Sequence, residues 1–174
     1  MARPSRREAL LDAALVVIRR DGARALTLDA VAAESGTSKG GVLYHFGSKR
    51  VLVDGLVERW LDGLEAQLGG DDVAAAYVRS CDLSGIAPDA TAAEFGVLAA
   101  LIAEPQALET VRARHVAWMD RMLAGGLNRD DAWLVRLAAD GLWYADLLGI
   151  AAPQGEDRRR LIERLVTLAS GDRQ

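Results

Sequence analysis

Side chains that donate hydrogen bonds gather in the short stretch from residue 37 to residue 49. They are Thr37, Ser38, Lys39, Tyr44, His45 and Lys49. Side chains of these types bind phosphate oxygens and base edges in protein–DNA complexes. Gly40 and Gly41 lie in the same stretch, and each costs a helix about 1 kcal/mol relative to alanine. A close approach to a DNA groove would explain that cost, and the alternative is a merely weak, loop-like helix. The stretch therefore predicts contact with DNA.

Two short predicted helices position these donors. Thr27 is a suitable N-cap for a helix that ends at Gly36. Thr37 or Ser38 is a suitable N-cap for the next helix, which runs to about Phe46 before Gly47 breaks the chain. Two helices joined by a short turn that contains glycine form a helix-turn-helix, and the second of them lies in the major groove.

Charge is divided unevenly along the 174 residues, whose net charge is -4. Residues 1–50 carry nine basic and five acidic side chains, a net charge of +4, whereas residues 51–174 carry 12 basic and 20 acidic side chains, a net charge of -8. This asymmetry indicates a polyanionic partner for the first part only. A solvated basic face is the commoner origin of such a pattern, so the charge alone does not decide.

The run GTSKGGVLYHFGSK, preceded by Gly22, Thr27 and the pair Val31-Ala32, resembles the TetR/AcrR family of bacterial one-component transcription regulators. The resemblance covers about the first 55 residues. It implies an all-α fold of about nine helices, with an N-terminal three-helix helix-turn-helix head and a C-terminal helical body for ligand binding and dimerisation. It also implies a repressor that binds double-stranded DNA as a homodimer and leaves a palindromic operator when a small-molecule effector binds.

The resemblance further implies two groups of DNA-contacting residues. The groove-facing residues would be Thr37, Ser38, Lys39, Gly40 and Gly41, and the phosphate contacts would be Thr27, Tyr44, His45 and Lys49. Leu43 departs from the family, because many members have a tyrosine there that touches the DNA backbone. We expect the arginines of the N-terminal arm, Arg3, Arg6 and Arg7, to replace that contact.

We expect residues 1–50 to form the DNA-binding domain and residues 51–174 to form the regulatory and dimerisation domain. Outside the helix-turn-helix, helices are predicted over Ser5–Arg20, Ser48–Leu68, Asp72–Cys81, Ala90–Ala103, Pro105–Leu123, Asp130–Ile150 and Gly155–Ala169. The turn at residues 69–72 marks the start of the body.

Large aromatic and methionine side chains of the body are candidates for an effector pocket. They are Trp60, Phe95, His115, Trp118, Met119, Met122, Trp143 and Tyr144. Such side chains line adaptable small-molecule pockets, but they are more commonly packing residues. His115 is likewise either a core histidine or a ligand-contacting or pH-sensitive one.

The last two predicted helices carry surplus apolar surface. The helix Asp130–Ile150 is apolar nearly all round, which one neighbouring helix cannot cover. A four-helix interface between two copies would cover it. Its candidate residues are Trp133, Leu137, Gly141, Tyr144, Leu148, Leu161, Leu165 and Leu168. Arg158, Arg159, Arg160 and Glu163 are expected on the outside of the last helix.

Two other classes of function are alternatives. A small helical enzyme could use Asp140 and Asp146 as an acid/base pair, but Asp140 is more simply an ion-pair partner of Arg136, and Asp146 a polar edge. A helical interaction module would leave the donors of residues 37–49 unexplained. We therefore expect no catalytic residue, no cofactor and no metal. The single Cys81 excludes a disulfide within the chain, and the absence of a signal peptide or long apolar run predicts a cytoplasmic protein without a membrane partner.

Overall fold

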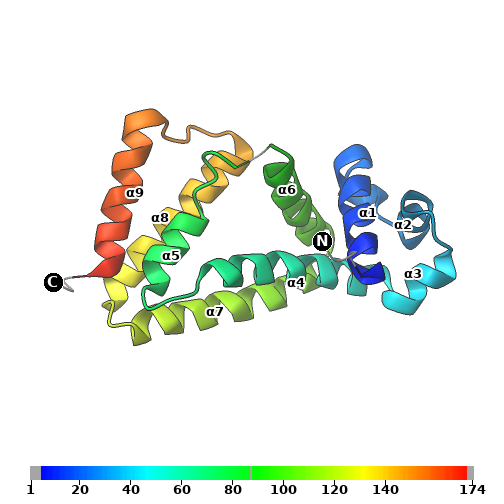
Figure 1. Ribbon diagram of the computed structural model, residues 1–174, viewed down its shortest axis with the longest axis horizontal. Coiled ribbons are helices and arrows are strands. Elements are labelled where there is room, and N and C mark those ends of the chain that lie inside the picture. The colour runs from blue at the N-terminus through cyan, green and yellow to red at the C-terminus, as the bar shows by residue number, and fades with distance from the viewer. Residues whose placement is uncertain (1–4, 87, 172–174) are drawn as a thin grey trace. The chain divides into compact units, whose positions relative to one another are not determined.

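The computed structural model describes residues 5–86 and 88–171, and all regular elements in these residues are helical (Figure 1). The α-helices are α1 (Arg6–Asp21), α2 (Leu28–Ser35), α3 (Lys39–His45), α4 (Lys49–Gln67), α5 (Val73–Ser80), α6 (Pro88–Ala103), α7 (Leu108–Ala124), α8 (Arg129–Leu148) and α9 (Gly155–Ser170). Two short 3-10 helices are η1 (Ala23–Ala25) and η2 (Pro105–Ala107). The predicted all-α fold of about nine helices is confirmed over this part of the chain. None of its helices is both long enough and apolar enough to cross a membrane.

Helix ends lie close to the positions that the capping residues predict. The hydroxyl of Ser5 accepts a hydrogen bond from the backbone N–H of Glu8 (3.2 Å), so α1 begins one residue after its predicted cap. The two 3-10 helices are differences from the prediction. Pro105 opens η2, and α7 therefore starts at Leu108 rather than at the proline.

Two compact units divide the chain. Unit 1 consists of Met1–Leu61 and Pro88–Arg112, and unit 2 consists of Asp62–Ala87 and Ala113–Gln174. The divisions fall inside α4, at the start of α6, and between residues 112 and 113 of α7. Each unit has its own buried core, and each is described separately below.

In unit 1, α1 packs against α2 and α6, and α2 packs against α3. The first half of α4 lies close to α1 at Gly55. A Cβ atom at Gly55 would lie only 3.0 Å from Cε1 of Phe46 and 3.0 Å from Nη2 of Arg7, so the absence of a side chain permits this approach. The Arg7 guanidinium lies over the Phe46 ring, 5.3 Å from its centroid, which is within cation–π range. The fully buried side chains of this core include Leu10, Leu11, Val17, Val31, Val42, Phe46, Leu52 and Leu56.

In unit 2, α5 packs against α8 and α9, and these two helices pack against each other (Figure 1). Tyr77 of α5 is buried, and its hydroxyl donates a hydrogen bond to Oδ1 of Asp140 on α8 (2.5 Å). Asp140 also lies 3.5 Å from Nε of Arg136, which confirms the predicted ion pair. Burial, with the neighbouring Asp140 charge adding to it, raises the pKa of the Tyr77 phenol. This phenol therefore stays protonated and acts as a donor.

Glu65 joins the end of α4 to the later part of α7, and both of these segments belong to unit 2. Its carboxylate accepts a hydrogen bond from the indole N–H of Trp118 (2.5 Å) and another from the guanidinium of Arg121. The bond from Trp118 is the main reason why the pKa of Glu65 lies below its ordinary value, and the bond from Arg121 adds to it. Arg114 pairs with Asp62 one turn away (2.6 Å). These contacts fix the buried Trp118 indole in place.

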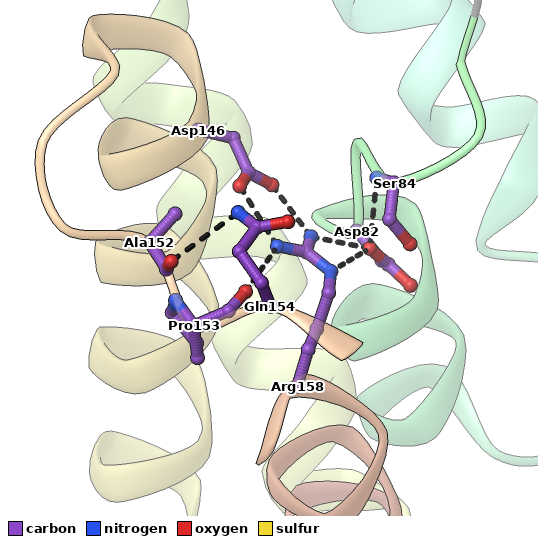
Figure 2. A network of polar contacts seen from close by, with 7 residues as sticks. All are labelled: Asp82, Ser84, Asp146, Ala152, Pro153, Gln154 and Arg158. Atoms are coloured by element: carbon purple, nitrogen blue, oxygen red, sulfur yellow. Dashed lines mark hydrogen bonds and ion pairs between the residues drawn. The ribbon is translucent and has the colours of Figure 1, made fainter. Parts of the chain in front are cut away.

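A buried arginine network joins α9, α8 and the segment after α5 (Figure 2). Nη1 and Nη2 of Arg158 donate to the two carboxylate oxygens of Asp146 at 2.8 and 2.6 Å. Nε of Arg158 donates to Oδ1 of Asp82 at 2.9 Å, and the backbone N–H of Ser84 donates to the same oxygen at 2.9 Å. The expectation that Arg158 lies on the solvent-facing side of α9 is therefore wrong. Its side chain is buried, and two carboxylates compensate the burial of its charge. Asp146 is part of the same network and not merely a polar edge.

Candidate nucleic-acid interface

The helix-turn-helix is built by three local interactions. The hydroxyl of Thr27 caps α2 by accepting the N–H of Ala30 (3.0 Å). Gly36 ends α2 in the left-handed region (φ 64°, ψ 26°), where glycine avoids the strain of a side chain. The hydroxyl of Ser38 then caps α3 by accepting the N–H of Gly41 (3.1 Å). The predicted turn between α2 and α3, residues 36–38, is thus observed, and Ser38 rather than Thr37 is the cap.

One side of α3 is buried and the other is open to solvent. Val42 and Phe46, at the inner side and the C-cap, are fully buried, which holds the helix in the unit 1 core. The residues on the open side are Ser38, Lys39, Gly40, Leu43 and Tyr44. Tyr44 is 85% exposed and its ring meets the His45 ring edge-on with centroids 5.1 Å apart. A tyrosine this exposed contributes little to the core, so its ring is available to another molecule.

The two glycines of α3 have different structural surroundings. A Cβ at Gly41 would lie 2.8 Å from the Thr37 hydroxyl oxygen, so packing within the turn requires glycine there. A Cβ at Gly40 would meet nothing nearer than the Ser38 hydroxyl oxygen at 3.8 Å. No contact within the described residues therefore requires a glycine at position 40.

Acidic neighbours already hold the two lysines of the predicted interface. Nζ of Lys39 lies 2.9 Å from Oδ2 of Asp29 on α2, and Nζ of Lys49 lies 3.5 Å from Oε1 of Glu104 at the end of α6. Sequence reasoning missed both carboxylates. Lys49 and Glu104 are 55 positions apart, so spacing along the chain gives no signal of this pair.

The N-terminal arm lies partly within the described residues. The Arg6 guanidinium donates to the Thr37 hydroxyl (3.0 Å), which places it beside the groove-facing segment. Arg7 instead lies over Phe46 and 3.6 Å from Glu58, in the packing between α1 and α4. Arg3 lies outside the described residues. Arg6 thus lies beside the turn that precedes α3, whereas Arg7 lies beside Phe46 at the C-cap of that helix.

The candidate pocket residues do not lie in one unit. Trp60 and Phe95 belong to unit 1, whereas His115, Trp118, Met119, Met122, Trp143 and Tyr144 belong to unit 2. Within unit 2 the rings of His115 and Trp118 are 4.9 Å apart, and the ring of Tyr77 lies 6.0 Å from Trp118. Sequence reasoning did not include Tyr77 among the candidate pocket residues, because the apolar spacing on α5 indicates only that this position is buried. Trp118, Met119 and Met122 are buried, and Trp143 lies against Tyr144 with ring centroids 4.9 Å apart.

The candidate dimer residues divide by burial. Trp133, Leu137, Tyr144 and Leu148 are exposed on α8, and their spacing of four, seven and four residues puts them on one side of the helix. Leu134, which sequence reasoning omitted, is exposed as well. Gly141 is exposed with nothing within 4 Å of its Cβ position. Leu165 is buried within the chain, and Leu161 and Leu168 are half-buried.

The described residues contain no group of three or more histidine, cysteine or carboxylate side chains that could hold a metal ion. Asp140 and Asp146, the carboxylates considered for acid/base chemistry, are engaged with Arg136 and Tyr77 and with Arg158. Both carboxylates thus take part in ion pairs and hydrogen bonds within unit 2.

A capped helix-turn-helix at the N-terminus of an all-helical chain defines a helix-turn-helix transcription regulator. Residues 10–56 match the model of the bacterial regulatory proteins of the tetR family, and residues 71–170 match the tetracyclin repressor-like C-terminal domain. The chain belongs to the TetR family, which confirms the resemblance noted in its sequence. It is a DNA-binding transcriptional regulator with a C-terminal domain of the ligand-binding type, and it is not an enzyme.

Solved structures share this fold. The multidrug binding protein EbrR, complexed with malachite green, is 24% identical with a TM-score of 0.68, and the match covers 94% of this chain and 99% of EbrR. A TetR-family member from Streptomyces coelicolor A3 is 22% identical with a TM-score of 0.69, covering 94% and 99%. GusR of Salmonella enterica is 17% identical with a TM-score of 0.69, covering 94% of each chain. The comparison with curated proteins found no match.

Proposed function

We propose that this regulator is a homodimeric repressor whose two α3 helices bind successive major grooves of a palindromic operator. The observation that carries the proposal is the open side of α3, where Tyr44 is 85% exposed and no contact within the described residues requires a glycine at position 40. The two half-sites would lie about 34 to 36 Å apart, one turn of B-form DNA, or a little more. Residues 1–50 form the DNA-binding domain in this proposal, and residues 51–174 form the regulatory and dimerisation domain.

The residues of the interface divide into two roles. Thr37, Ser38, Lys39, Gly40 and Gly41 face the bases, and Thr27, Tyr44, His45 and Lys49 hold the phosphates. The open side of α3 supports the first role for Lys39 and Gly40. The cap positions of Thr27 and Ser38 support contact with the backbone as well, because N-terminal ends of helices favour anions. Arg6, which donates to Thr37, would supply the phosphate contact that Leu43 lacks.

Dimerisation through α8 and α9 is supported by the exposed apolar side of α8. Tryptophan, leucine and tyrosine side chains on one side of a helix are expensive to leave in water, at about 25 cal/mol for each Å² of apolar surface. In a homodimer, the exposed side of α8 in one copy would pack against the same side of α8 in the other copy, and these side chains would be covered. Leu165 would then support the interface from within the chain, since it is already buried.

A small-molecule effector is the proposed signal for release. EbrR, which has the same fold, is described as a multidrug binding protein and forms complexes with malachite green and with ethidium. The aromatic rings of His115, Trp118 and Tyr77 lie together in unit 2, and the carboxylates beside them are already paired with arginines. We therefore propose an effector with a flat apolar surface. By linkage, bound operator DNA must weaken effector binding by the same factor by which the bound effector weakens operator binding.

Two lysine variants test the DNA-binding proposal. Operator fragments selected from genomic DNA at moderate salt serve as ligands. The fluorescence anisotropy of each labelled fragment gives the affinity, its dependence on salt, and the number of chains bound per fragment. We expect two chains per operator. Lys49→Ala should weaken binding to all sequences alike, and because the dimer loses one phosphate contact in each of its two chains, it should reduce the slope of log affinity against log salt by about 1.8. Lys39→Ala should change the preferred bases. A wild-type protein that binds no fragment, or whose affinity does not change with salt, would refute the proposal.

A further inference from the structure

Lys49 stands at a point of concentrated positive charge. It is the first residue of α4, and the first turn of that helix contains no acidic side chain. The next residue, Arg50, is a second cation that pairs with Asp54 (3.6 Å), and the N-terminal end of a helix has a partial positive charge of its own. A negatively charged group is therefore strongly favoured beside Lys49, whether it comes from the protein or from DNA.

Glu104 supplies that negative charge in the structure. Oε1 of Glu104 lies 3.5 Å from Nζ of Lys49, and both side chains are about one-third exposed, at 30% and 33%. The backbone fixes Glu104 firmly, because its N–H bonds to the carbonyl of Ala100 (2.9 Å) and its carbonyl accepts the N–H of Ala107 (3.0 Å). The carboxylate is thus held at the corner between α6 and η2.

The ion pair between Lys39 and Asp29 is more exposed to solvent than the pair between Lys49 and Glu104. Lys39 and Asp29 are closer, at 2.9 Å, but their side chains are 57% and 67% exposed. Solvent and salt screen such a pair, which typically contributes little. The pair at Lys49 is screened less, and its two residues fall in different family-defined regions, residues 10–56 for Lys49 and residues 71–170 for Glu104. A residue of the C-terminal region therefore sits on a proposed DNA contact within unit 1.

We propose that Glu104 is an intramolecular competitor for the DNA phosphate at Lys49. The DNA-free protein holds Lys49 on the Glu104 carboxylate, and a bound phosphate must replace or oppose that carboxylate. The position of the α6 end thereby sets how much positive charge the head offers to DNA. This inference rests on the proposed role of Lys49 as a phosphate contact.

The test compares Glu104→Gln with wild type in the same anisotropy measurement at low salt. Glutamine keeps the shape of the side chain and removes the charge. We expect binding to all DNA sequences alike to tighten by about two- to fivefold per chain, the range set by a partly exposed ion pair, and therefore by about four- to twenty-five-fold for the two chains of a dimer. Glu104→Asp, which retracts the carboxylate, should give a smaller gain in the same direction and serves if the glutamine variant does not fold. Glu109→Gln, an exposed position on α7 in the same unit, makes the same change in net charge and should give a clearly smaller gain.

A double-mutant comparison decides between competition and general repulsion. In a Lys49→Ala background, Glu104→Gln should no longer strengthen DNA binding. An equal gain with and without Lys49, or no gain in wild type, would overturn the competition. If Lys49→Ala alone leaves DNA binding unchanged, the proposed role of Lys49 fails instead, so the two failures are distinguishable. Circular dichroism melts of each variant confirm that the fold is intact.

Discussion

Removing the Arg158 guanidinium should destabilise unit 2 more than removing any other arginine of α9. The Arg158 side chain is only 6% exposed, and those of Asp146 and Asp82 are 12% and 23% exposed. Arg158→Ala would leave two largely buried carboxylates without a counter-charge. Breaking a buried ion pair in this way costs about 3 to 5 kcal/mol. Because Asp82 retains some contact with water, we expect the lower end, about 3 kcal/mol.

The neighbouring Arg159 is a matched control. It lies on the same helix and pairs with Glu156 and Glu163, but its side chain is 60% exposed. Exposed pairs of this kind contribute about 0 to 1 kcal/mol. Arg159→Ala removes the same group from the same helix and should therefore cost at most about 1 kcal/mol. The difference between the two variants isolates the effect of burial.

Urea unfolding and thermal unfolding, both followed by circular dichroism at one fixed protein concentration, measure the two costs as a free energy of unfolding and as a Tm. For a chain of this size, about 3 kcal/mol corresponds to a drop in Tm of roughly 6 to 12 °C. Equal Tm values for the two variants would contradict the assigned importance of the buried network. So would an Arg158→Ala variant as stable as wild type.

The pH dependence of the same comparison provides a second check. Burial works to raise the pKa of Asp82, but the hydrogen bonds from Ser84 and Arg158 outweigh it and hold that pKa below its ordinary value. A lowered pKa in the folded state stabilises the protein above the unfolded value of about 3.9, and this stabilisation is lost as pH falls through the folded pKa. The gap between wild type and Arg158→Ala should therefore be largest near neutral pH and shrink in acid. A gap that widened as pH fell would reverse the assigned sign.

Two further predictions concern the packing of each unit. Gly55→Ala should destabilise unit 1 by about 1 to 3 kcal/mol, because the added methyl group would overlap Phe46; urea unfolding checks this, and an unchanged midpoint would contradict it. Tyr77→Phe should cost about 1.5 to 3 kcal/mol by removing the hydrogen bond to Asp140. Because burial raises the pKa of Tyr77, the wild-type protein should lose stability as pH rises above about 10, whereas the variant should not show this loss. If the stabilities of the two proteins fell in parallel at alkaline pH, the assignment would be wrong.

Local interactions made most helix boundaries predictable. Thr27 and Ser5 cap their helices through bonds to N–H groups three residues ahead, and Gly36 ends α2 by its own backbone freedom. These effects involve neighbours along the chain, so the residue types and their order suffice. The same is true of the inward and outward sides of α3, where Val42 and Phe46 are buried as their apolar character indicates. The η1 and η2 turns were missed because short 3-10 helices have weak sequence preferences.

Partners of charged side chains could not be predicted in the same way. Arg158, set among the exposed Arg159 and Arg160, looks like a surface residue in the sequence, yet it binds Asp82, 76 positions earlier. Glu104 reaches Lys49 only because the end of α6 is held in unit 1.

The sequence by itself determined the family, the all-helical fold and the stretch of α3 that is proposed to face DNA, because caps, glycines and apolar spacing act over a few residues. The tertiary structure alone decided which carboxylates hold Lys39, Lys49 and Arg158, and which glycine of α3 is free of internal packing. Those outcomes depend on which distant segments packing brings together. The residue type of a charged or small side chain does not tell whether it becomes buried or stays in water.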